Sequence, residues 1–410
     1  MARKQHVVNQ LGIDPGRRRT SSTLDVPTWV DQMVPFGDPD RQSLIDAIVS
    51  DITGIGGPIQ ILLDDPGISE VMINGPEDVY IERAGKLEKT AIRFRDTGHL
   101  RLVIETMLEP SGRGISDNNT LVDARLPDGS RLNVVTSPVS IFGDVVTIRK
   151  FTKTPWNLDN LVGKGTMSDA MRKLLEAAVV AKRSIIVSGG TGSGKTTLLN
   201  ALSSCIPKDE RIVSIEDVAE LRLQKPHRIA LESRPSRNDL KEIPIRDLVR
   251  NALRMRPDRI IIGEVRGGEA LDMLQALNTG HEGGLATLHA NTPRDCLSRL
   301  ETMVLMAGED LPLSAIRQQI SSAVHMIVQI GRNADGSRRV SHISEVIAME
   351  GDVITMQDIF TYERFSAHAG HSEGRFTATG IRPKFFDALQ ATGYALPPLV
   401  SPSAERRNRF

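Results

Sequence analysis

Residues 184–200 read SIIVSGGTGSGKTTLLN, and this stretch decides the fold of the chain. Gly189, Gly194, Lys195 and Thr196 complete the pattern G-x-x-x-x-G-K-[ST], and the apolar run IIV stands before it, where a strand is expected. A chance match in a glycine-rich turn is the alternative, and the preceding strand and the complete motif count against it. The stretch therefore predicts a phosphate-binding loop between a strand and a helix, and a bound nucleoside triphosphate.

Each residue type in this loop has a chemical reason. Glycines allow backbone angles closed to other residues, so successive N–H groups can turn inward around an anion at the start of a helix. Lys195 would neutralise the outer phosphates, and the Thr196 hydroxyl would bind the Mg²⁺ that bridges them. We therefore expect ATP and Mg²⁺ as the ligands. The residues expected to hold them are Gly190, Thr191, Gly192, Ser193, Gly194, Lys195, Thr196 and Thr197.

The composition is that of a soluble globular protein: 410 residues, 40% hydrophobic and 25% charged. Lys plus Arg and Asp plus Glu number 51 each, so the chain lacks the net positive charge of non-specific nucleic-acid binders, and no nucleic acid is expected. Its two cysteines, Cys205 and Cys296, form no C-x-x-C pair, so no zinc site is expected. Without an apolar run of membrane-spanning length or a secretory pattern at the N-terminus, we expect a cytoplasmic protein.

The pattern along the chain predicts two domains. From Ser184 onward, apolar strands alternate with amphipathic helices, which is typical of a mainly parallel sheet covered by helices. Before it, shorter strands and one helix indicate a smaller α+β domain, and Pro155 interrupts regular structure between the two. We therefore expect an α/β fold. Its order is a flexible N-terminal arm (1–40), an α+β N-terminal domain (41–150), a linker (151–162), a P-loop domain with a mainly parallel sheet (163–360) and a C-terminal extension and tail (361–410).

A carboxylate is expected close to the phosphate loop. Residues 258–266, DRIIIGEVR, read as an apolar strand that delivers Glu264 at its C-terminal end, where ligands gather in open parallel sheets. There it could hold a Mg²⁺-bound water or orient the water that attacks the terminal phosphate. A strand-ending glutamate on the surface is the alternative. The shared sheet favours a catalytic and metal-binding Glu264.

Three more acids follow another predicted strand, in VSIEDVAE at 213–220. Glu216, Asp217 and Glu220 would repel one another unless a cation relieves the repulsion, and one of them could polarise the attacking water. A solvated turn in which Asp217 caps a helix is the alternative. The spacing does not decide between these readings, or which acid acts on water.

Two histidines flank a short strand of small residues. His281 and His289 are eight residues apart, which is not the i, i+4 spacing of two metal ligands on one helix face. A histidine at a strand end can donate to phosphate or hold a catalytic carboxylate. A purely structural histidine is the alternative for each.

Arginines of the first domain form a weaker set of candidates. Phosphoryl transfer is commonly helped by an arginine that reaches in from another domain or subunit. Arg125, Arg131 and Arg149 lie in the first domain, but most arginines only solvate a surface, so these three become candidates only through a family resemblance.

Several stretches together resemble the secretion ATPases of type II and type IV machines, and most closely their CpaF/TadA branch, which powers tight-adherence (Flp) type IV pili. They are the phosphate loop, IEDVAE, RPDRIIIGEVRGGEALDMLQALNTGHEGG, ATLHANTPRDCLSRLETM and, in the first domain, VDARLPDGSRLN. The resemblance covers about residues 45–360, and its motifs occur in the family's order.

The resemblance implies that residues 163–360 form a RecA-like P-loop ATPase domain, and it implies a role for each motif. IEDVAE corresponds to the family's Asp box, RIIIGEVR to an atypical Walker B and the two histidines to a His box. First-domain arginines approach the phosphates, a role that falls to Arg131 and Arg149 and less directly to Arg125. A homo-hexameric ring would turn hydrolysis into movement of an inner-membrane platform protein at the cytoplasmic face. The implied catalytic set is Glu264, Glu220, Arg131, Arg149, Arg125, His281 and His289.

One departure and two rival functions remain. Type II secretion and pilus-extension relatives often carry a four-cysteine metal module, for which this chain has no cysteines. A RecA-like nucleic-acid translocase would share the loop, but the neutral charge and the lack of an aromatic-basic stripe count against it. A nucleotide-switched scaffold with little turnover is the other rival, and the set Glu264, Glu220 and Lys195 counts against it. The sequence favours neither pilus extension nor pilus retraction as the direction of work.

Overall fold

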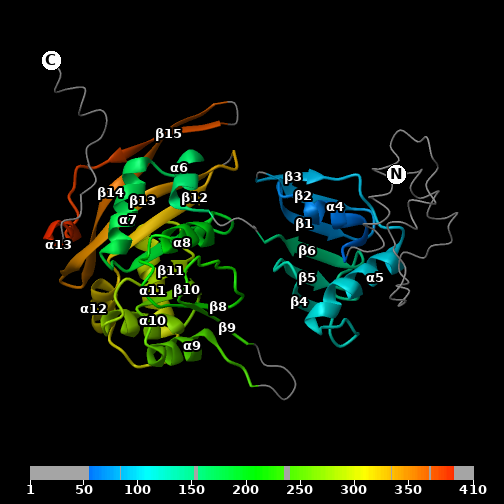
Figure 1. The fold of residues 1–410 in the computed structure, drawn as a ribbon, viewed down its shortest axis with the longest axis horizontal. Coiled ribbons are helices and arrows are strands. Elements are labelled where there is room, and N and C mark those ends of the chain that lie inside the picture. Colours follow the sequence, from blue (N-terminus) through cyan, green and yellow to red (C-terminus); the bar gives the residue numbers. More distant parts are fainter. Residues whose placement is uncertain are drawn as a thin grey trace. The chain divides into compact units, whose positions relative to one another are not determined.

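The computed structural model describes residues 55–83, 85–151, 156–234, 241–333, 335–368 and 371–391 (Figure 1). The chain divides into two compact units, Met1–Lys153 and Thr154–Phe410. The expected arm (1–40) and the helical face that the sequence predicts from Arg41 lie outside the described residues.

The first unit is built on one antiparallel sheet, which has six strands within the described residues, in the order β3-β2-β1-β6-β5-β4. Its helix α5 begins after Asp96, whose carboxylate accepts the N–H of His99 at 2.7 Å as an N-cap. The elements are α4 (Gln60–Asp64), β1 (Ile68–Asn74), β2 (Val79–Arg83), β3 (Lys86–Lys89), α5 (Thr97–Leu108), β4 (Leu121–Arg125), β5 (Arg131–Val135) and β6 (Val145–Arg149).

One face of this sheet packs against the apolar core of the described residues. Along β5 and β6, Leu132, Val134, Val146 and Ile148 alternate with more exposed residues, and they belong to the same apolar core as α5. The intervening residues point to the opposite face, because successive side chains of a strand alternate. The three candidate arginines lie among these outward residues.

The second unit contains a sheet with nine strands among the described residues, in the order β15-β14-β13-β12-β7-β11-β10-β8-β9. The strands from β12 to β9 run parallel, whereas β12 to β15 pair antiparallel. The strands are β7 (Ile185–Ser188), β8 (Ile212–Glu216), β9 (Arg228–Glu232), β10 (Arg259–Val265), β11 (Leu285–Leu288), β12 (Met326–Arg332), β13 (Arg338–Glu350), β14 (Val353–His368) and β15 (His371–Ala378).

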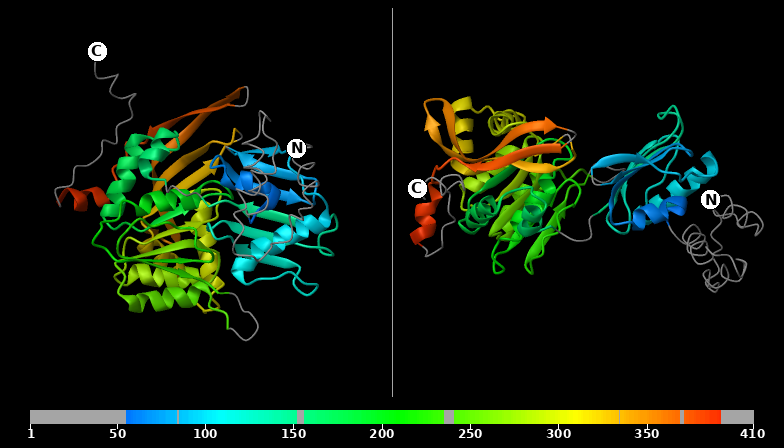
Figure 2. Two further views of the ribbon diagram at one scale, coloured as in Figure 1. Left: turned by 45° about the vertical axis from the view of Figure 1, so that its right-hand side comes forward. Right: turned by 90° about the horizontal axis from the view of Figure 1, so that it is seen from above.

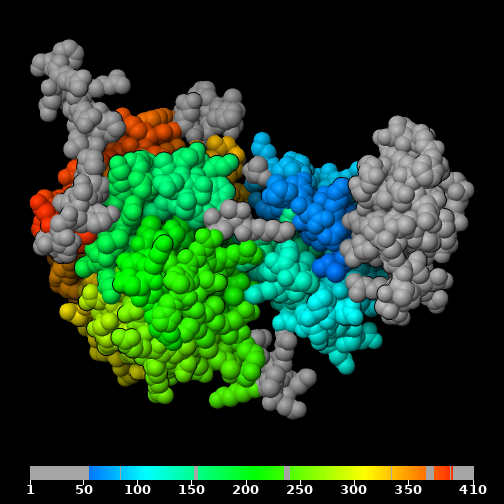
Figure 3. Space-filling view, in the orientation of Figure 1, coloured from blue at the N-terminus to red at the C-terminus, as the bar shows by residue number. Residues whose placement is uncertain are grey.

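Helices cover both faces of this sheet. Ile185 and Val187 point into a core that includes α6, α7, α8 and α13, whereas Ile186 points into a core with α9 to α12. The outer surface of α6 to α8 appears in green in Figure 3. None of the described helices is both long and apolar enough to cross a lipid bilayer. The helices are α6 (Leu158–Gly163), α7 (Asp169–Val180), α8 (Lys195–Ser203), α9 (Ile245–Ala252), α10 (Glu269–Asn278), α11 (Pro293–Leu305), α12 (Leu313–Ala323) and α13 (Phe385–Ala391).

The predicted parallel sheet with covering helices is confirmed, but the structure differs at the edges of the predicted domain. Residues 158–162, expected within the linker, belong to α6, whose Leu158 and Leu161 are buried. Beyond residue 360, β14 and β15 continue the sheet as long strands, drawn in orange in Figure 2, and α13 adds three buried side chains to the core. The sheet of the second unit therefore continues past residue 360.

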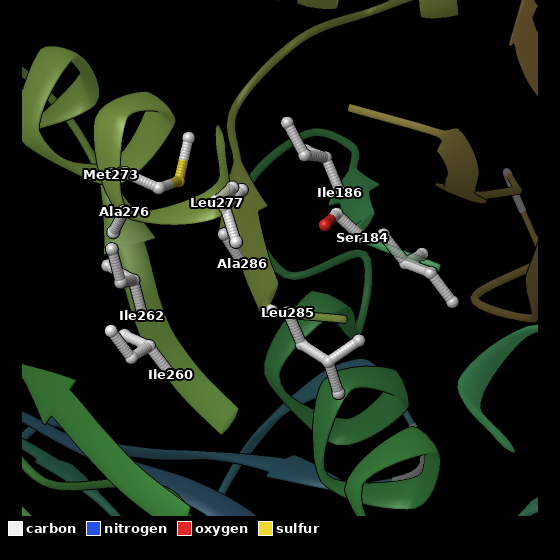
Figure 4. A pocket seen from close by; sticks show the side chains of 11 residues that line it. Ser184, Ile186, Ile260, Ile262, Met273, Ala276, Leu277, Leu285 and Ala286 are labelled. Atoms are coloured by element: carbon white, nitrogen blue, oxygen red, sulfur yellow. The ribbon is translucent and has the colours of Figure 1, made fainter. Parts of the chain in front are cut away.

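A narrow gap lies between α10 and the sheet. Side chains of α10, β7, β10 and β11 line it, and Ser184 supplies a hydroxyl (Figure 4). That hydroxyl accepts the Gly283 N–H at 3.3 Å. Because none of the lining side chains is ionisable, the gap is a packing feature of the core and offers no chemistry.

Candidate functional site

The predicted phosphate loop connects β7 to α8. Gly194 precedes α8 with φ +96°, a conformation open to glycine, and no side chain caps the first turn of the helix. Within the loop, the Ser193 hydroxyl donates to the Gly190 carbonyl at 2.8 Å. An ideal Cβ at Gly189 would lie 2.2 Å from the Ile330 carbonyl, so only glycine fits against β12 there. The loop thus presents an uncapped helix start, where an anion binds favourably.

Lys195 lies at the start of α8 and is almost fully buried. Its Nζ donates to the Gly190 carbonyl at 3.0 Å and lies 3.2 Å from Nε2 of His289, which follows β11. Because β7 and β11 are parallel neighbours, their C-terminal ends bring loop and histidine to the same edge of the sheet. The structure therefore brings Lys195 and His289 together, a contact that the sequence did not predict.

Glu264 lies on the neighbouring strand β10, and its two carboxylate oxygens face different partners. Oε1 is 2.5 Å from His289 Nε2, a close contact without hydrogen-bond alignment. Oε2 accepts two N–H groups of Arg266, the Nε donating at 2.7 Å. The same Arg266 guanidinium reaches Asp217 Oδ2 at 3.2 Å. A continuous chain of contacts thus runs from the phosphate loop to the acids after β8.

The charged groups along these contacts shift the pKa values of His289 and Arg266. Burial and the charge of Lys195 lower the pKa of His289 below its usual value, and the charge of Glu264 opposes them. The imidazole is therefore neutral near pH 7. Burial acts to lower the pKa of Arg266, but its hydrogen bond to Glu264 and the charges of Glu264, Asp217 and Glu220 raise it overall. Arg266 thus acts as a fixed positive charge among three acids.

The acids of the predicted Asp box have different surroundings. Asp217 is exposed at the end of β8, and its Oδ1 accepts the hydroxyl of Ser233 at 3.0 Å. Glu220 is half-buried and close enough to Arg266 to raise its pKa. Glu216, in contrast, is buried and turns its carboxyl back under the segment that follows.

The residues present fit a phosphate group with Mg²⁺. Thr196 is half-buried in the first turn of α8, so its hydroxyl belongs to the same helix start as Lys195. Glu264 adds a carboxylate at the same edge of the sheet. Hydroxyl and carboxylate oxygens together with phosphate are the ligands that Mg²⁺ prefers.

The structure separates His281 from this group. His281 precedes β11, and the adjoining Gly283 N–H bonds to Ser184, directly before β7. The phosphate loop follows the other end of β7, so His281 lies at the opposite edge of the sheet. Within one chain His281 therefore lies away from the phosphate loop, and its catalytic role stays a prediction from the resemblance.

The three candidate arginines form one row. Arg125 is the cross-strand partner of Arg131, and Arg131 is the partner of Arg149, on β4, β5 and β6. The row continues to Glu70 on β1, whose carboxylate is 3.5 Å from Arg149 Nε. Residues directly opposite share a face. The row and the phosphate loop belong to different units, so a meeting of the arginines with phosphates stays a prediction.

Two arginines at the loop were missed by sequence reasoning. Arg266 ends the predicted strand, where its two acidic neighbours in space cannot be identified from spacing. Arg338 begins β13 and its Nε donates to the Gly192 carbonyl at 3.0 Å, so it supports the phosphate loop from an antiparallel strand. The run GRNADGSRR, a turn flanked by basic residues, was the available signal for Arg338.

Comparisons with known proteins agree with this architecture. A family model described as type II/IV secretion system protein matches residues 55–380. A protein of Mycobacterium tuberculosis, provisionally named a conjugal transfer protein, is 36% identical over 325 residues, 78% of this chain and 92% of its own length. The type IV secretion system protein VirB11 of Brucella suis is 35% identical over 318 residues, 70% of this chain and 88% of VirB11.

A solved structure gives the same fold. The pilus retraction motor PilT with bound ADP matches with a TM-score of 0.51 at 22% identity, covering 72% of this chain and 83% of PilT. This likeness concerns the fold alone, an N-terminal domain followed by a RecA-like ATPase domain. The predicted fold class is thereby confirmed.

Proposed function

Because the chain belongs to the family of type II/IV secretion system proteins, whose members are secretion ATPases, we propose that it is a Mg²⁺-dependent ATPase that drives a pilus or secretion machine. The observation that carries this proposal is the chain of contacts from Lys195 through His289, Glu264 and Arg266 to Asp217. It joins a phosphate-binding loop to two carboxylates within one sheet edge.

The residues divide the work of hydrolysis. Lys195 and the loop N–H groups bind the phosphates, and Glu264 orients the attacking water. Thr196 and Glu264 hold Mg²⁺, which supplies positive charge to the phosphates when it is bound. Of the Asp-box acids, Asp217 contacts Arg266 directly and Glu220 acts on it through its charge. We propose a catalytic role for Glu220 from its place in the motif. His289 positions the Glu264 carboxylate.

The machine we propose is a tight-adherence pilus motor. The support is the resemblance of the ordered motifs to that branch and the absence of cysteines for a four-cysteine module. We propose a homo-hexameric ring, cytoplasmic and peripheral to the inner membrane, that acts on platform proteins. Arg131 and Arg149, with Arg125 beside them, would reach the phosphates when the two domains close.

The test compares purified wild type with Lys195→Ala and, as a matched surface control, Lys173→Ala, an exposed lysine of α7. Nucleotide binding, phosphate release with Mg²⁺ or chelator, and native mass are measured in the same samples. We expect Mg²⁺-dependent turnover by a six-fold assembly of wild type and of the control, and neither binding nor turnover by Lys195→Ala. DNA-stimulated turnover would instead support a translocase, and binding without turnover a switched scaffold.

The branch is tested in cells whose only copy is Lys195→Ala. We expect surface pili to be lost. Intact pili together with a loss of protein secretion would assign the chain to a secretion machine.

A further inference from the structure

The buried carboxyl of Glu216 supports the segment that carries Glu220. Glu216 is the last residue of β8 and is 3% exposed. Its Oε1 accepts the N–H of Glu220 at 2.8 Å and the N–H of Leu221 at 2.9 Å. One oxygen atom thus satisfies two consecutive backbone donors of the turn that leaves the strand.

Space for this arrangement comes from the neighbouring strand. An ideal Cβ at Gly263 of β10 would lie 2.7 Å from Glu216 Cγ, closer than side chains tolerate. Gly263 directly precedes Glu264. The Glu216 side chain therefore fills the place next to the strand end that carries the proposed catalytic carboxylate.

The turn is fixed at a second point as well. The N–H of Arg222 donates to Asn200 Oδ1 at 3.0 Å, and Asn200 belongs to α8, the helix that begins at the phosphate loop. The turn is thereby tied both to the end of β8 and to the loop helix. Its two acids, Asp217 and Glu220, both act on Arg266.

We propose that Glu216 is a positioning residue, which places the turn 217–221 and with it the Glu220 carboxylate through the position of Oε1, without need of its own charge. This inference rests on the proposed ATPase function of the site. It distinguishes Glu216 from Asp217 and Glu220, which the sequence left equivalent.

Two observations support a role that does not depend on charge. Oε2 is buried and has no hydrogen-bond partner within the described residues, so it takes no part in holding the turn. Burial raises the pKa of Glu216 to about 7; the two backbone N–H groups oppose this shift, and the charges of Glu220 and Glu232 add to it. Much of the carboxyl is therefore neutral at physiological pH.

Two substitutions separate acceptor position from charge. Glu216→Gln keeps an oxygen at the same reach and removes the charge. Glu216→Asp keeps the charge and withdraws the oxygen by one methylene. Amide hydrogen exchange of residues 217–222, ATP affinity and kcat are measured for both and for the wild type. Glu345→Asp is the control. Glu345, on β13, is a second buried glutamate, and it accepts the backbone N–H of Lys384 at 2.9 Å.

We expect Glu216→Gln to keep the amide protection of residues 217–222 and a kcat within about threefold of wild type. Glu216→Asp should lose this protection, and its kcat should fall at least about tenfold at unchanged ATP affinity, because small misplacements of catalytic groups are costly. Glu345→Asp should leave kcat unchanged. The reverse order, with Asp active and Gln inactive, would overturn the proposal, as would equal protection in both variants. If the wild type itself hydrolyses no ATP, the proposed function fails, and the exchange data alone decide whether Glu216 holds the turn.

Discussion

Nε2 of His289 lies 2.5 Å from Oε1 of Glu264 and 3.2 Å from Nζ of Lys195. A neutral imidazole therefore stands between the cation expected to bind phosphate and the carboxylate expected to orient water. Phosphates would attract Lys195 away from the ring, so nucleotide binding and the position of Glu264 are linked through His289.

Replacement of His289 by Gln should therefore impair chemistry more than binding. We expect kcat to fall about tenfold or more, within the usual range for groups that act on proton transfer or its geometry, with little change in ATP affinity. Phosphate release and binding of a fluorescent ATP analogue measure the two quantities. His342→Gln, on β13, is the control; equal kcat in the two variants would remove His289 from the site.

Arg266 should be needed for its shape as well as its charge. Two N–H groups of its guanidinium hold one oxygen of Glu264, and a third reaches Asp217. A lysine cannot reproduce this fork. We expect both Arg266→Lys and Arg266→Gln to lower kcat by roughly ten- to hundredfold, on the scale of losing a preorganised electrostatic contact. Full activity of Arg266→Lys would show that charge alone suffices.

The arginine row of the first unit should act on turnover and leave the fold intact. Arg131 and Arg149 are cross-strand partners on the outward face of the sheet, so their removal leaves the apolar core unchanged. We expect Arg131→Ala and Arg149→Ala to lower kcat by about 10³-fold, as for arginines that stabilise transferring phosphoryl groups, and Arg125→Ala to have a smaller effect. Arg95→Ala, which removes an exposed arginine paired with Asp96, is the control. Wild-type kcat in both row variants would contradict the role.

Glu216 should make stability depend on pH. Its pKa is raised from 4.5 to about 7 in the folded state, so between these values the native protein holds a proton that the unfolded chain has released. The contribution of Glu216 to the free energy of unfolding is largest at low pH, and it falls by about 3 kcal/mol in total as the pH rises. Glu216→Gln removes the effect. In urea unfolding, we expect the free energy of unfolding of the variant to rise relative to that of wild type from pH 5 to pH 8. If the difference between the two proteins does not change with pH, the pKa of Glu216 is not raised.

Arg259 should be the residue of the second unit whose loss costs most stability. Its side chain is fully buried, is paired with Glu210 and donates to the carbonyls of Gly283 and Val179 at 3.0 and 2.9 Å. Removal would take away the cation that pairs with Glu210 and the donors to both carbonyls, so we expect Arg259→Met to lower the free energy of unfolding by about 3–5 kcal/mol. Arg375→Gln, which removes an exposed partner of Glu363, should change it by less than about 0.5 kcal/mol. Similar unfolding midpoints for the two variants would refute this.

The sequence predicted those site residues that follow strands. Lys195, Glu264 and His289 each come at or just after the C-terminal end of a parallel strand, and such ends meet at one edge of the sheet. His281 was included because its motif corresponds to the His box of the family that the sequence resembles. It precedes the strand that His289 follows, however, and four residues of extended chain carry the two to opposite edges.

The contacts that organise the site were harder to predict from the sequence. Arg266 meets Asp217 across 49 positions of sequence, and no local pattern reports such a pairing. The strand β15 and the part of β14 beyond residue 360 were missed for a different reason. Their segments carry many polar residues without clean alternation, because they lie at the outer edge of the sheet where burial is partial. Patterns predict burial well and tertiary pairing poorly.

The most direct test of the ATPase claim is a parallel measurement of bound ATP and released phosphate for wild type and Glu264→Gln in Mg²⁺. We predict that the wild type turns over, while the variant binds ATP to full occupancy and releases phosphate at least about a hundredfold more slowly, because the water-orienting charge is gone. Equal phosphate release by both proteins, or loss of ATP binding in the variant, would contradict the assignment of Glu264 and with it the proposed site.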